Sequence, residues 1–241
     1  MKLVTYERNG LQALGAIVDS RVVDLPTASG VNGFPTDMLG LLSGGEAALQ
    51  AAREALAHAL DRDPSAGGHG GEPLSLPVQS IRLLAPVPRP GKLICIGLNY
   101  RDHAEELNMK VPERPVVFAK YANTVVGPEA HVVLPPISSE VDYEAELAVV
   151  IGRRARQVSE GEALDYVAGY TMLNDVSARD LQMRLGGGQW VWGKTLDTFA
   201  PMGPAVVTRD EVEDPDSLDI AFRLNGRTMQ SSNTRNLIFG V

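Results

Sequence analysis

Residues 141–152, with the sequence VDYEAELAVVIG, combine acidic and apolar residues in the two-residue period of a β-strand. Side chains alternate between the two faces of a strand, so Asp142, Glu144 and Glu146 are predicted to share one face. Ala148 continues that face as an apolar surface, which predicts that other parts of the fold cover it. Covered carboxylates need a counter-charge or a bound cation, because burying unpaired charge is costly. The alternative is an antiparallel strand whose acidic face lies in water.

A further carboxylate follows the next apolar stretch. Asp175, in TMLNDVSARD, comes after a predicted strand and before a predicted helix, a position from which its side chain can reach a neighbouring strand end. Together with Glu144 and Glu146 it would complete an all-oxygen ligand set, which favours Mg²⁺, Mn²⁺ or Ca²⁺ over zinc. The alternative for Asp175 is an ordinary helix N-cap.

The stretch GLNYRDHAEELN contains a candidate general base. His103 and Glu106 are three residues apart, so one helical turn places both side chains on the same face. In that arrangement the carboxylate can orient and polarise the imidazole. A His-x-x-Glu spacing on its own is also typical of an ordinary surface helix.

Two lysines stand alone in largely apolar stretches. Lys120 lies in VVFAKY and Lys194 in WVWGKTLDTF, and a lone cation in such surroundings is expected to pair with an acid or a bound anion. Each could therefore bind a substrate carboxylate or form a structural salt bridge. The residues near the motifs that are candidates for lining a substrate pocket, with structural roles equally open, are Tyr100, Arg101, Arg179, Gln182 and Thr195.

The bulk composition bounds the class of protein. The chain has 241 residues, of which 44% are hydrophobic and 22% charged, as in soluble globular proteins. Its formal net charge of −8 opposes general binding to nucleic acid or to anionic membrane surfaces. The first residues lack the apolar region of a secretory signal, and no apolar run is long enough to span a bilayer, so we expect a cytoplasmic protein. The single cysteine, Cys95, excludes an internal disulfide and is expected to be a core residue.

The N-terminal segment is predicted to form a small β-rich domain over residues 1–75. Asn9 and Gly10 separate two alternating apolar runs and indicate a hairpin turn. Residues 44–60 have the apolar spacing of one amphipathic helix. Strands are predicted at 2–6, 14–19 and 21–25.

The second predicted domain covers residues 80–241. A Gly- and Pro-rich stretch that includes His69 precedes it and is predicted to be a linker. Strands predominate in this domain, with short helices predicted at 161–166 and 177–185. The sequence therefore predicts an α+β protein that is mainly β.

Six ordered motifs in the second predicted domain resemble those of one protein superfamily. They are GLNYRDHAEE, PVVFAKYANTVVGP, VDYEAELAVVIG, YTMLNDVSARDLQ, WGKTLDTFAPMGP and LNGRTMQSSNT. Their order and spacing are similar to those of the fumarylacetoacetate hydrolase superfamily, including its domain-containing and acylpyruvase-like members. The resemblance implies a mixed β-roll catalytic domain behind a small N-terminal domain, and a homodimer. Members of the superfamily continue beyond the last residues of this chain, so we expect the catalytic domain to be C-terminally incomplete.

The resemblance also implies roles for individual residues. Glu144, Glu146 and Asp175 would bind a divalent metal ion, Mg²⁺ or Mn²⁺. The other implied roles belong to His103 and Glu106, which would lie on a segment that orders over the substrate and activates water, and to Lys194, which would help to bind the substrate.

The implied substrate is a small 2-oxo or diketo acid. Such an acid chelates a metal ion through its carboxylate and keto oxygens, and the metal then stabilises an enolate. Our leading hypothesis is hydrolysis of a carbon–carbon bond in acylpyruvate or fumarylacetoacetate-like diketo acids. The alternatives are decarboxylation or keto–enol tautomerisation of oxaloacetate at the same metal site, and an inactive, truncated family member.

Overall fold

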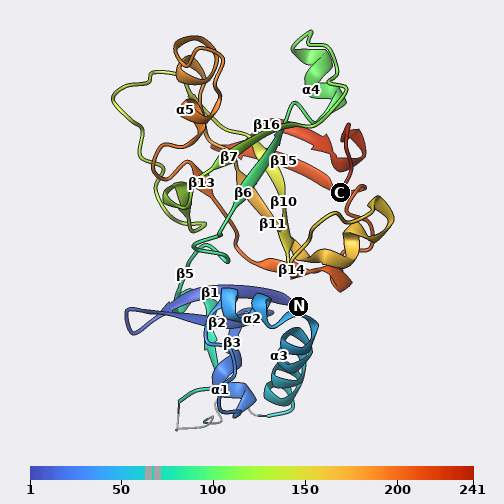
Figure 1. Cartoon of the computed structure of the whole chain (residues 1–241). Coiled ribbons are helices and arrows are strands. Elements are labelled where there is room, and N and C mark those ends of the chain that lie inside the picture. The colour runs from blue at the N-terminus through green and yellow to red at the C-terminus, as the bar shows by residue number, and fades with distance from the viewer. Residues whose placement is uncertain (63–66, 68–71) are drawn as a thin grey trace.

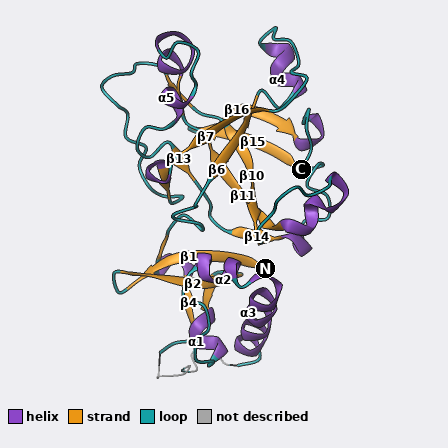
Figure 2. Cartoon of the chain, in the orientation of Figure 1, coloured by secondary structure: helices purple, strands orange, loops and turns teal. Residues whose placement is uncertain are grey.

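Figure 1 shows the computed structural model of the chain, which describes residues 1–62, 67 and 72–241. Strands predominate over helices (Figure 2), so the predicted α+β class, mainly β, is confirmed. His69 lies outside the described residues, and the prediction that it belongs to a linker stays a prediction. Within the described ranges, no helix has the length and apolar character needed to cross a membrane.

The predicted N-terminal hairpin is present. β1 (Lys2–Arg8) and β2 (Leu11–Val18) pair from Lys2 with Ile17 to Arg8 with Leu11 and are joined by Asn9 and Gly10. The φ angles of these two residues are 52° and 77°. Two positive φ angles are what a two-residue type I′ turn requires, and this turn matches the twist of the strands that it joins.

One sheet crosses the boundary between the two predicted domains. Its strands follow the order β10-β11-β14-β1-β2-β3-β4, and β5 also pairs with β1. β1 is therefore bonded to β2 on one edge, and to β14 and β5 on the other. The division into residues 1–75 and 80–241 stays a prediction. The strands not yet introduced are β3 (Arg21–Asp24), β4 (Ser75–Pro77), β5 (Arg82–Leu83), β10 (Ala145–Ile151), β11 (Val167–Asn174) and β14 (Val206–Thr208).

Three helices pack beside the N-terminal strands (Figure 1): α1 (Leu25–Ser29), α2 (Met38–Ser43) and α3 (Gly45–Leu60). α3 is the helix predicted at 44–60. Its buried residues recur every three or four positions, which gives one apolar stripe towards the core. The residues of that stripe are Leu49, Ala52, Ala55 and Ala59.

The main hydrophobic core contains residues from both ends of the chain. Leu3 of β1, Leu173 of β11 and Val206 of β14 belong to the same buried cluster. Ala148 and Val150 of β10 pack against this cluster. The face of β10 that continues from Glu146 is therefore covered, as predicted.

Shorter elements build the part of the fold that carries the site. Paired strands are β6 (Leu93–Gly97) with β7 (Val116–Lys120), β8 (Val125–Val126) with β13 (Ala200–Pro201), β9 (Val141–Asp142) with β12 (Ser177–Ala178), and β15 (Asp219–Leu224) with β16 (Arg227–Asn233). The α-helices are α4 (Arg101–Glu106) and α5 (Val191–Lys194). Single turns of 3₁₀-helix occur at Val78–Ser80, Ala122–Thr124, Arg209–Glu211 and Thr234–Asn236. The helix predicted at 161–166 is a longer 3₁₀-helix, Glu160–Tyr166.

The prediction that residues 141–152 form one continuous strand was wrong. β9 and β10 are separate, and Tyr143 and Glu144 lie between them. At the break, the Glu144 N–H donates to the Asn174 side chain at 3.0 Å, and the Glu144 carbonyl accepts from the Asp175 N–H at 2.8 Å. A side chain thus replaces the regular ladder, and β9 and β10 pair with different strands.

The helix predicted at 177–185 begins later than expected. Ser177 and Ala178 form β12, because Ser177 pairs with Asp142 of β9. The helical turn starts at Arg179 and continues as the π-helix Leu181–Leu185.

Candidate metal and substrate site

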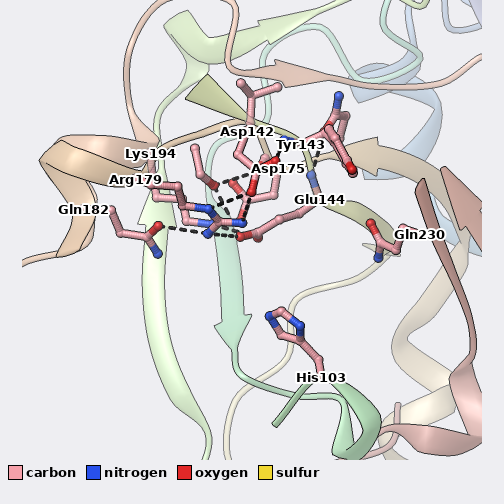
Figure 3. Close-up of polar contacts among 12 residues, drawn as sticks. His103, Asp142, Tyr143, Glu144, Asp175, Arg179, Gln182, Lys194 and Gln230 are labelled. Atoms are coloured by element: carbon pink, nitrogen blue, oxygen red, sulfur yellow. Dashed lines mark hydrogen bonds and ion pairs between the residues drawn. The ribbon is translucent and has the colours of Figure 1, made fainter. Parts of the chain in front are cut away.

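The interrupted strand brings the predicted carboxylates to one place. Glu144 lies in the break before β10, Glu146 lies on β10, and Asp175 directly follows β11. The antiparallel register pairs Ala145 with Asn174, which sets Asp175 beside Glu144. Figure 3 shows Glu144 and Asp175 on facing segments with basic side chains between them.

Lys194 joins two of these carboxylates. It is the last residue of α5, and its side chain is only 2% exposed. Its Nζ donates to Glu144 Oε2 at 2.8 Å and to Asp175 Oδ2 at 2.9 Å. The same Nζ lies 5.1 Å from the ring centroid of Phe118, within the range of a cation–π contact. The structure therefore brings Lys194 to the acids, as the sequence predicts.

Arg179 holds the other side of Glu144. Its Nε donates to Asp142 Oδ2 at 2.9 Å, and its Nη1 donates to Glu144 Oε1 at 2.6 Å and to Gln182 Oε1 at 3.0 Å. These bonds fix the guanidinium between two carboxylates (Figure 3). Arg179 thus contacts the acids directly, Gln182 contacts Arg179, and their predicted contact with substrate stays a prediction.

Lys120 is a fully buried partner of Asp175. Its Nζ donates to Asp175 Oδ1 at 2.6 Å and to the Val176 carbonyl at 3.1 Å, and its side chain is 0% exposed. Burial lowers the pKa of Lys120, and the Asp175 carboxylate opposes that change. This geometry corresponds to the structural salt bridge that the sequence left open as an alternative to substrate binding.

Glu146 is the surplus acid of the cluster. Lys120, Arg179 and Lys194 form ion pairs with Asp142, Glu144 and Asp175, whereas Glu146 has no ion pair with any described residue. Burial, together with the Glu144 and Asp175 carboxylates, raises the pKa of Glu146 to about 8, and Lys194 opposes this rise. With Glu146 ionised, the four acids exceed the three bases by one negative charge.

The chemistry of these residues fits a hard divalent cation. Carboxylate oxygens are the ligands that Mg²⁺ and Mn²⁺ prefer, and no basic side chain of the described residues forms an ion pair with Glu146. In the described part of the chain, however, no three His, Cys, Asp or Glu side chains are arranged to hold one ion together. Lys194 Nζ lies between Glu144 and Asp175 instead. Joint binding of a metal ion by all three acids stays a prediction.

The predicted general base His103 and its carboxylate partner Glu106 both lie on α4, apart from the acids. His103 Nδ1 lies 3.6 Å from Glu106 Oε2, and the two side chains are 47% and 79% exposed. In Figure 3, His103 points towards the cluster from a separate segment, and no contact joins it to the labelled acids. His103 and Glu106 are therefore neighbours on one helical turn, as their i, i+3 spacing predicts.

The remaining pocket candidates have different surroundings. The Tyr100 hydroxyl is buried and has no hydrogen-bond partner among the described residues, and burial, together with the Glu146 carboxylate, raises its pKa. Arg101 is exposed at the start of α4 and forms no ion pair with a described residue. Thr195 Oγ1 donates to the Val191 carbonyl at 2.8 Å, which is a local helix contact.

Two further residues of the site, Asp142 and Gln230, have partners that no local sequence pattern indicates. Asp142 was predicted to share the acidic face, and the structure makes it a partner of Arg179. Gln230 of β16 exchanges two hydrogen bonds with the backbone of Ala145, between Glu144 and Glu146. Gln230 lies within the motif LNGRTMQSSNT, so the motif was the available signal, but its contact with β10 depends on the tertiary fold.

Comparisons with known proteins bear on the family of the chain. Residues 92–241 match a family model described as fumarylacetoacetate (FAA) hydrolase, C-terminal. The chain is 44% identical to the mitochondrial oxaloacetate tautomerase Fahd2a of Rattus norvegicus over 243 residues, covering 99% of this chain and 72% of the relative. It is 49% identical to the mitochondrial oxaloacetate tautomerase FAHD2A of Homo sapiens over 206 residues, covering 86% of this chain and 62% of that relative.

Solved structures are also similar to this chain over its whole length. A putative HpcE protein from Mycobacterium smegmatis matches with a TM-score of 0.80 and 33% identity, over 100% of this chain and 78% of the other. Maleylpyruvate hydrolase from Sphingobium sp. SYK-6, in complex with manganese(II) and pyruvate, matches with a TM-score of 0.77 and 30% identity, over 100% of this chain and 79% of the other.

Proposed function

Because the chain belongs to the fumarylacetoacetate hydrolase family, we propose that it is a divalent-metal-dependent enzyme that acts on a 2-oxo acid through an enolate. Within that class, we propose keto–enol tautomerisation of oxaloacetate or a similar dicarboxylic 2-oxo acid. The observation that carries the class is Glu146, a partly buried acid that lies beside two further carboxylates and forms no ion pair with a described residue. The names of the relatives with 44% and 49% identity favour the tautomerase over the hydrolase.

The residues of the site have separate roles in this proposal. Glu144, Glu146 and Asp175 would hold the metal ion, which when bound polarises the 2-keto oxygen and stabilises an enolate. Lys194, paired with Glu144 and Asp175, holds these two carboxylates in place and adds positive charge beside the substrate. Arg179 fixes the orientation of Glu144 through a charge-assisted hydrogen bond.

His103 supplies the proton transfer. Its Nδ1 faces Glu106, so Nε2 is left to accept a proton. In tautomerisation, that nitrogen takes the proton from C3 of the keto acid and returns it to the oxygen on C2, and the reverse path restores the ketone. Because α4 lies apart from the acids, this step requires the helix to approach the bound substrate.

Hydrolysis of an acylpyruvate is the second candidate. The likeness to a maleylpyruvate hydrolase solved with manganese(II) and pyruvate favours it, together with the His103–Glu106 pair. Here His103 would take a proton from water, the hydroxide would add to the acyl carbonyl, and the carbon–carbon bond would break. The products are a carboxylic acid and the enolate of pyruvate, which then takes up a proton.

A substrate comparison separates the two reactions. The protein is incubated with Mg²⁺ or Mn²⁺ and either enol-oxaloacetate or acetylpyruvate, and the ultraviolet absorbance of each enol is followed. We expect faster ketonisation of oxaloacetate with the wild type, and its loss in Glu146→Gln and His103→Ala. The control His131→Ala, at an exposed histidine, should match the wild type. Cleavage of acetylpyruvate alone would favour the hydrolase, and no turnover of either substrate would count against both reactions.

Assembly and location also remain predictions. The homodimer and the cytoplasmic location are expectations from the sequence, and the relatives named above carry the word mitochondrial in their names. The expectation that the catalytic domain is incomplete likewise stays a prediction, and the chain covers 62% to 72% of the length of those relatives.

A further inference from the structure

We propose that one face of β16 positions both halves of the site: Gln230 holds the segment that carries Glu144 and Glu146, and Ser232 holds Asp102 next to His103. This inference rests on the proposed function, because it assigns positioning roles around the proposed metal ligands and base. Figure 1 shows β16 between α4 and β10, the two elements that it would connect.

The first contact of β16 is with the metal-ligand strand. Gln230 Oε1 accepts from the Ala145 N–H at 2.9 Å, and Gln230 Nε2 donates to the Ala145 carbonyl at 3.2 Å. Both backbone groups of Ala145 therefore bond to one side chain on the edge of β10 away from β11. Ala145 lies between the two glutamates, so a shift of its peptide groups would move both carboxylates. Figure 3 shows Gln230 beside the segment that carries Glu144.

The second contact is with the helix that carries His103. Asp102 Oδ2 accepts from Ser232 Oγ at 2.5 Å and from Asn236 Nδ2 at 2.9 Å, and Asp102 Oδ1 accepts from the His103 N–H at 3.0 Å. These hydrogen bonds lower the pKa of Asp102, although partial burial opposes them. One carboxylate thus ties the start of α4 to β16 and to the turn that follows it.

The helix needs such a tie. α4 has six residues, and a helix this short is not stable without tertiary contacts. A further tie precedes it, because the Asn99 side chain donates to the Phe239 carbonyl at 3.0 Å and accepts from the Phe239 N–H at 2.9 Å. Both ties lead to the segment that begins with β16.

The two-residue period of a β-strand places the side chains that make these two contacts on the same face of β16. Gln230 and Ser232 are two residues apart, so they share one face of β16, and the exposed Ser231 lies on the other. The strand step between them is about 6.5–7 Å. β16 therefore acts as a spacer that fixes the position of α4 relative to the Glu144–Glu146 segment.

If Gln230 and Asp102 have these separate roles, substituting one should lower Mg²⁺ affinity, and substituting the other should alter α4 and turnover. Gln230→Met removes both hydrogen bonds to Ala145 at similar size, and we expect Mg²⁺ affinity by calorimetry to fall about tenfold or more. Asp102→Ala should leave Mg²⁺ affinity within twofold. In that variant we expect the amides of α4 to exchange about tenfold faster, and kcat on oxaloacetate to fall about tenfold or more with little change in KM. The control Ser231→Ala should match the wild type in all measurements.

Milder variants cover the case of a protein that does not fold. Gln230→Asn has an amide one methylene too short for Ala145, and Ser232→Ala removes one donor to Asp102. Wild-type affinity in the Gln230 variant, or wild-type exchange and kcat in the Asp102 variant, would overturn the inference while the proposed function stands. A wild type that binds no Mg²⁺ would overturn the proposed function and the role of Gln230, and amide exchange would still decide the role of Asp102.

Discussion

At the residue scale, buried ion pairs fix the orientation of the acids. Asp175 is held on one oxygen by Lys120 and on the other by Lys194, so its carboxylate has little freedom to rotate. Buried ion pairs often add little net stability, because desolvation offsets their attraction. Their value here is that they place charged carboxylates beside the partly buried Glu146. Breaking one pair nevertheless leaves an acid without its partner, which is costly.

Lys120→Met tests this cost. The variant leaves Asp175 Oδ1 and the Val176 carbonyl without their donor, so we expect the free energy of unfolding to fall by about 3 kcal/mol, since Lys194 still neutralises Asp175. Urea denaturation measures the change. Lys110→Met is the matched control, because Lys110 pairs with Glu113 at 3.3 Å with both side chains 86% exposed, and it should change stability by about 0.5 kcal/mol or less. Equal effects of the two substitutions would count against an ion-paired Asp175.

Cys95 is predicted to be a poor nucleophile. Burial raises the pKa of its thiol to about 12, Asp175 adds to the rise, and Lys120 and Lys194 oppose it. The thiolate is the reactive form and is scarce below that pH, so alkylation at pH 8 should be at least ~100-fold slower than for a free cysteine. Iodoacetamide labelling followed by mass spectrometry measures the rate, with the urea-unfolded chain as the control. Rapid labelling of the folded protein would show that the thiol is accessible and ionised.

The sequence identified the charged residues of the site but not their partners. Glu144, Asp175 and Lys194 stood out as charges in apolar surroundings, and the structure places them in contact. The pairing of Lys120 with Asp175 joins positions far apart in the chain, so no local pattern predicts it. The same holds for Gln230, whose partner is a backbone group.

At the element scale, β6 supports the site through an aromatic contact. A Cβ on Gly97 would lie 2.1 Å from Trp190 Cζ3, so only glycine leaves room for the indole ring. Trp190 packs edge-on against Phe118, with ring centroids 5.8 Å apart. Phe118 in turn lies beneath Lys194 Nζ. Gly97 is therefore connected to Lys194 through contacts with the rings of Trp190 and Phe118.

Gly97→Ala should disturb this stack. We expect a shifted tryptophan emission, a loss of about 1–3 kcal/mol in stability from overpacking, and lower turnover of oxaloacetate. Fluorescence, urea denaturation and the absorbance assay measure the three effects. Gly91→Ala is the control, since a Cβ there meets no atom within 4 Å. Unchanged emission and turnover in the Gly97 variant would mean that the stack does not support Lys194.

Regular elements were predictable, and irregular ones were not. The Asn9–Gly10 turn and α3 follow from turn chemistry and apolar spacing, which are local properties. The break at Glu144 depends on the Asn174 side chain, which accepts from the Glu144 N–H 30 positions earlier. Alternation of residue types continues through the break, so the pattern gave no sign of it.

At the scale of the whole molecule, the N-terminal strands and the site share one sheet and one core. β1 pairs with β14, which pairs with β11, and β11 pairs with β10. The N-terminal amine also donates to Thr208 Oγ1 at 2.6 Å. The sequence suggested two domains because a Gly- and Pro-rich stretch separates two groups of elements. Pairing between distant strands leaves no such local signal.

Leu3→Ala tests whether the chain unfolds as one unit. Leu3 is 0% exposed in the shared core, and its truncation should cost about 2–5 kcal/mol. Trp190 and Trp192 both lie in the C-terminal part, so their fluorescence reports on unfolding there. If the core is cooperative, the fluorescence transition in urea shifts by the full amount and coincides with the circular dichroism transition. An unshifted fluorescence transition would indicate two independent domains.

Glu146 is proposed as a ligand of a divalent cation, and calorimetric titration of Mg²⁺ into the wild type and Glu146→Gln tests this most directly. Glu129→Gln, at an exposed position, controls for loss of a carboxylate. We predict measurable binding to the wild type and to Glu129→Gln, and an affinity at least about tenfold weaker in Glu146→Gln. Equal affinity in all three proteins, or no binding to the wild type, would contradict the proposed metal site.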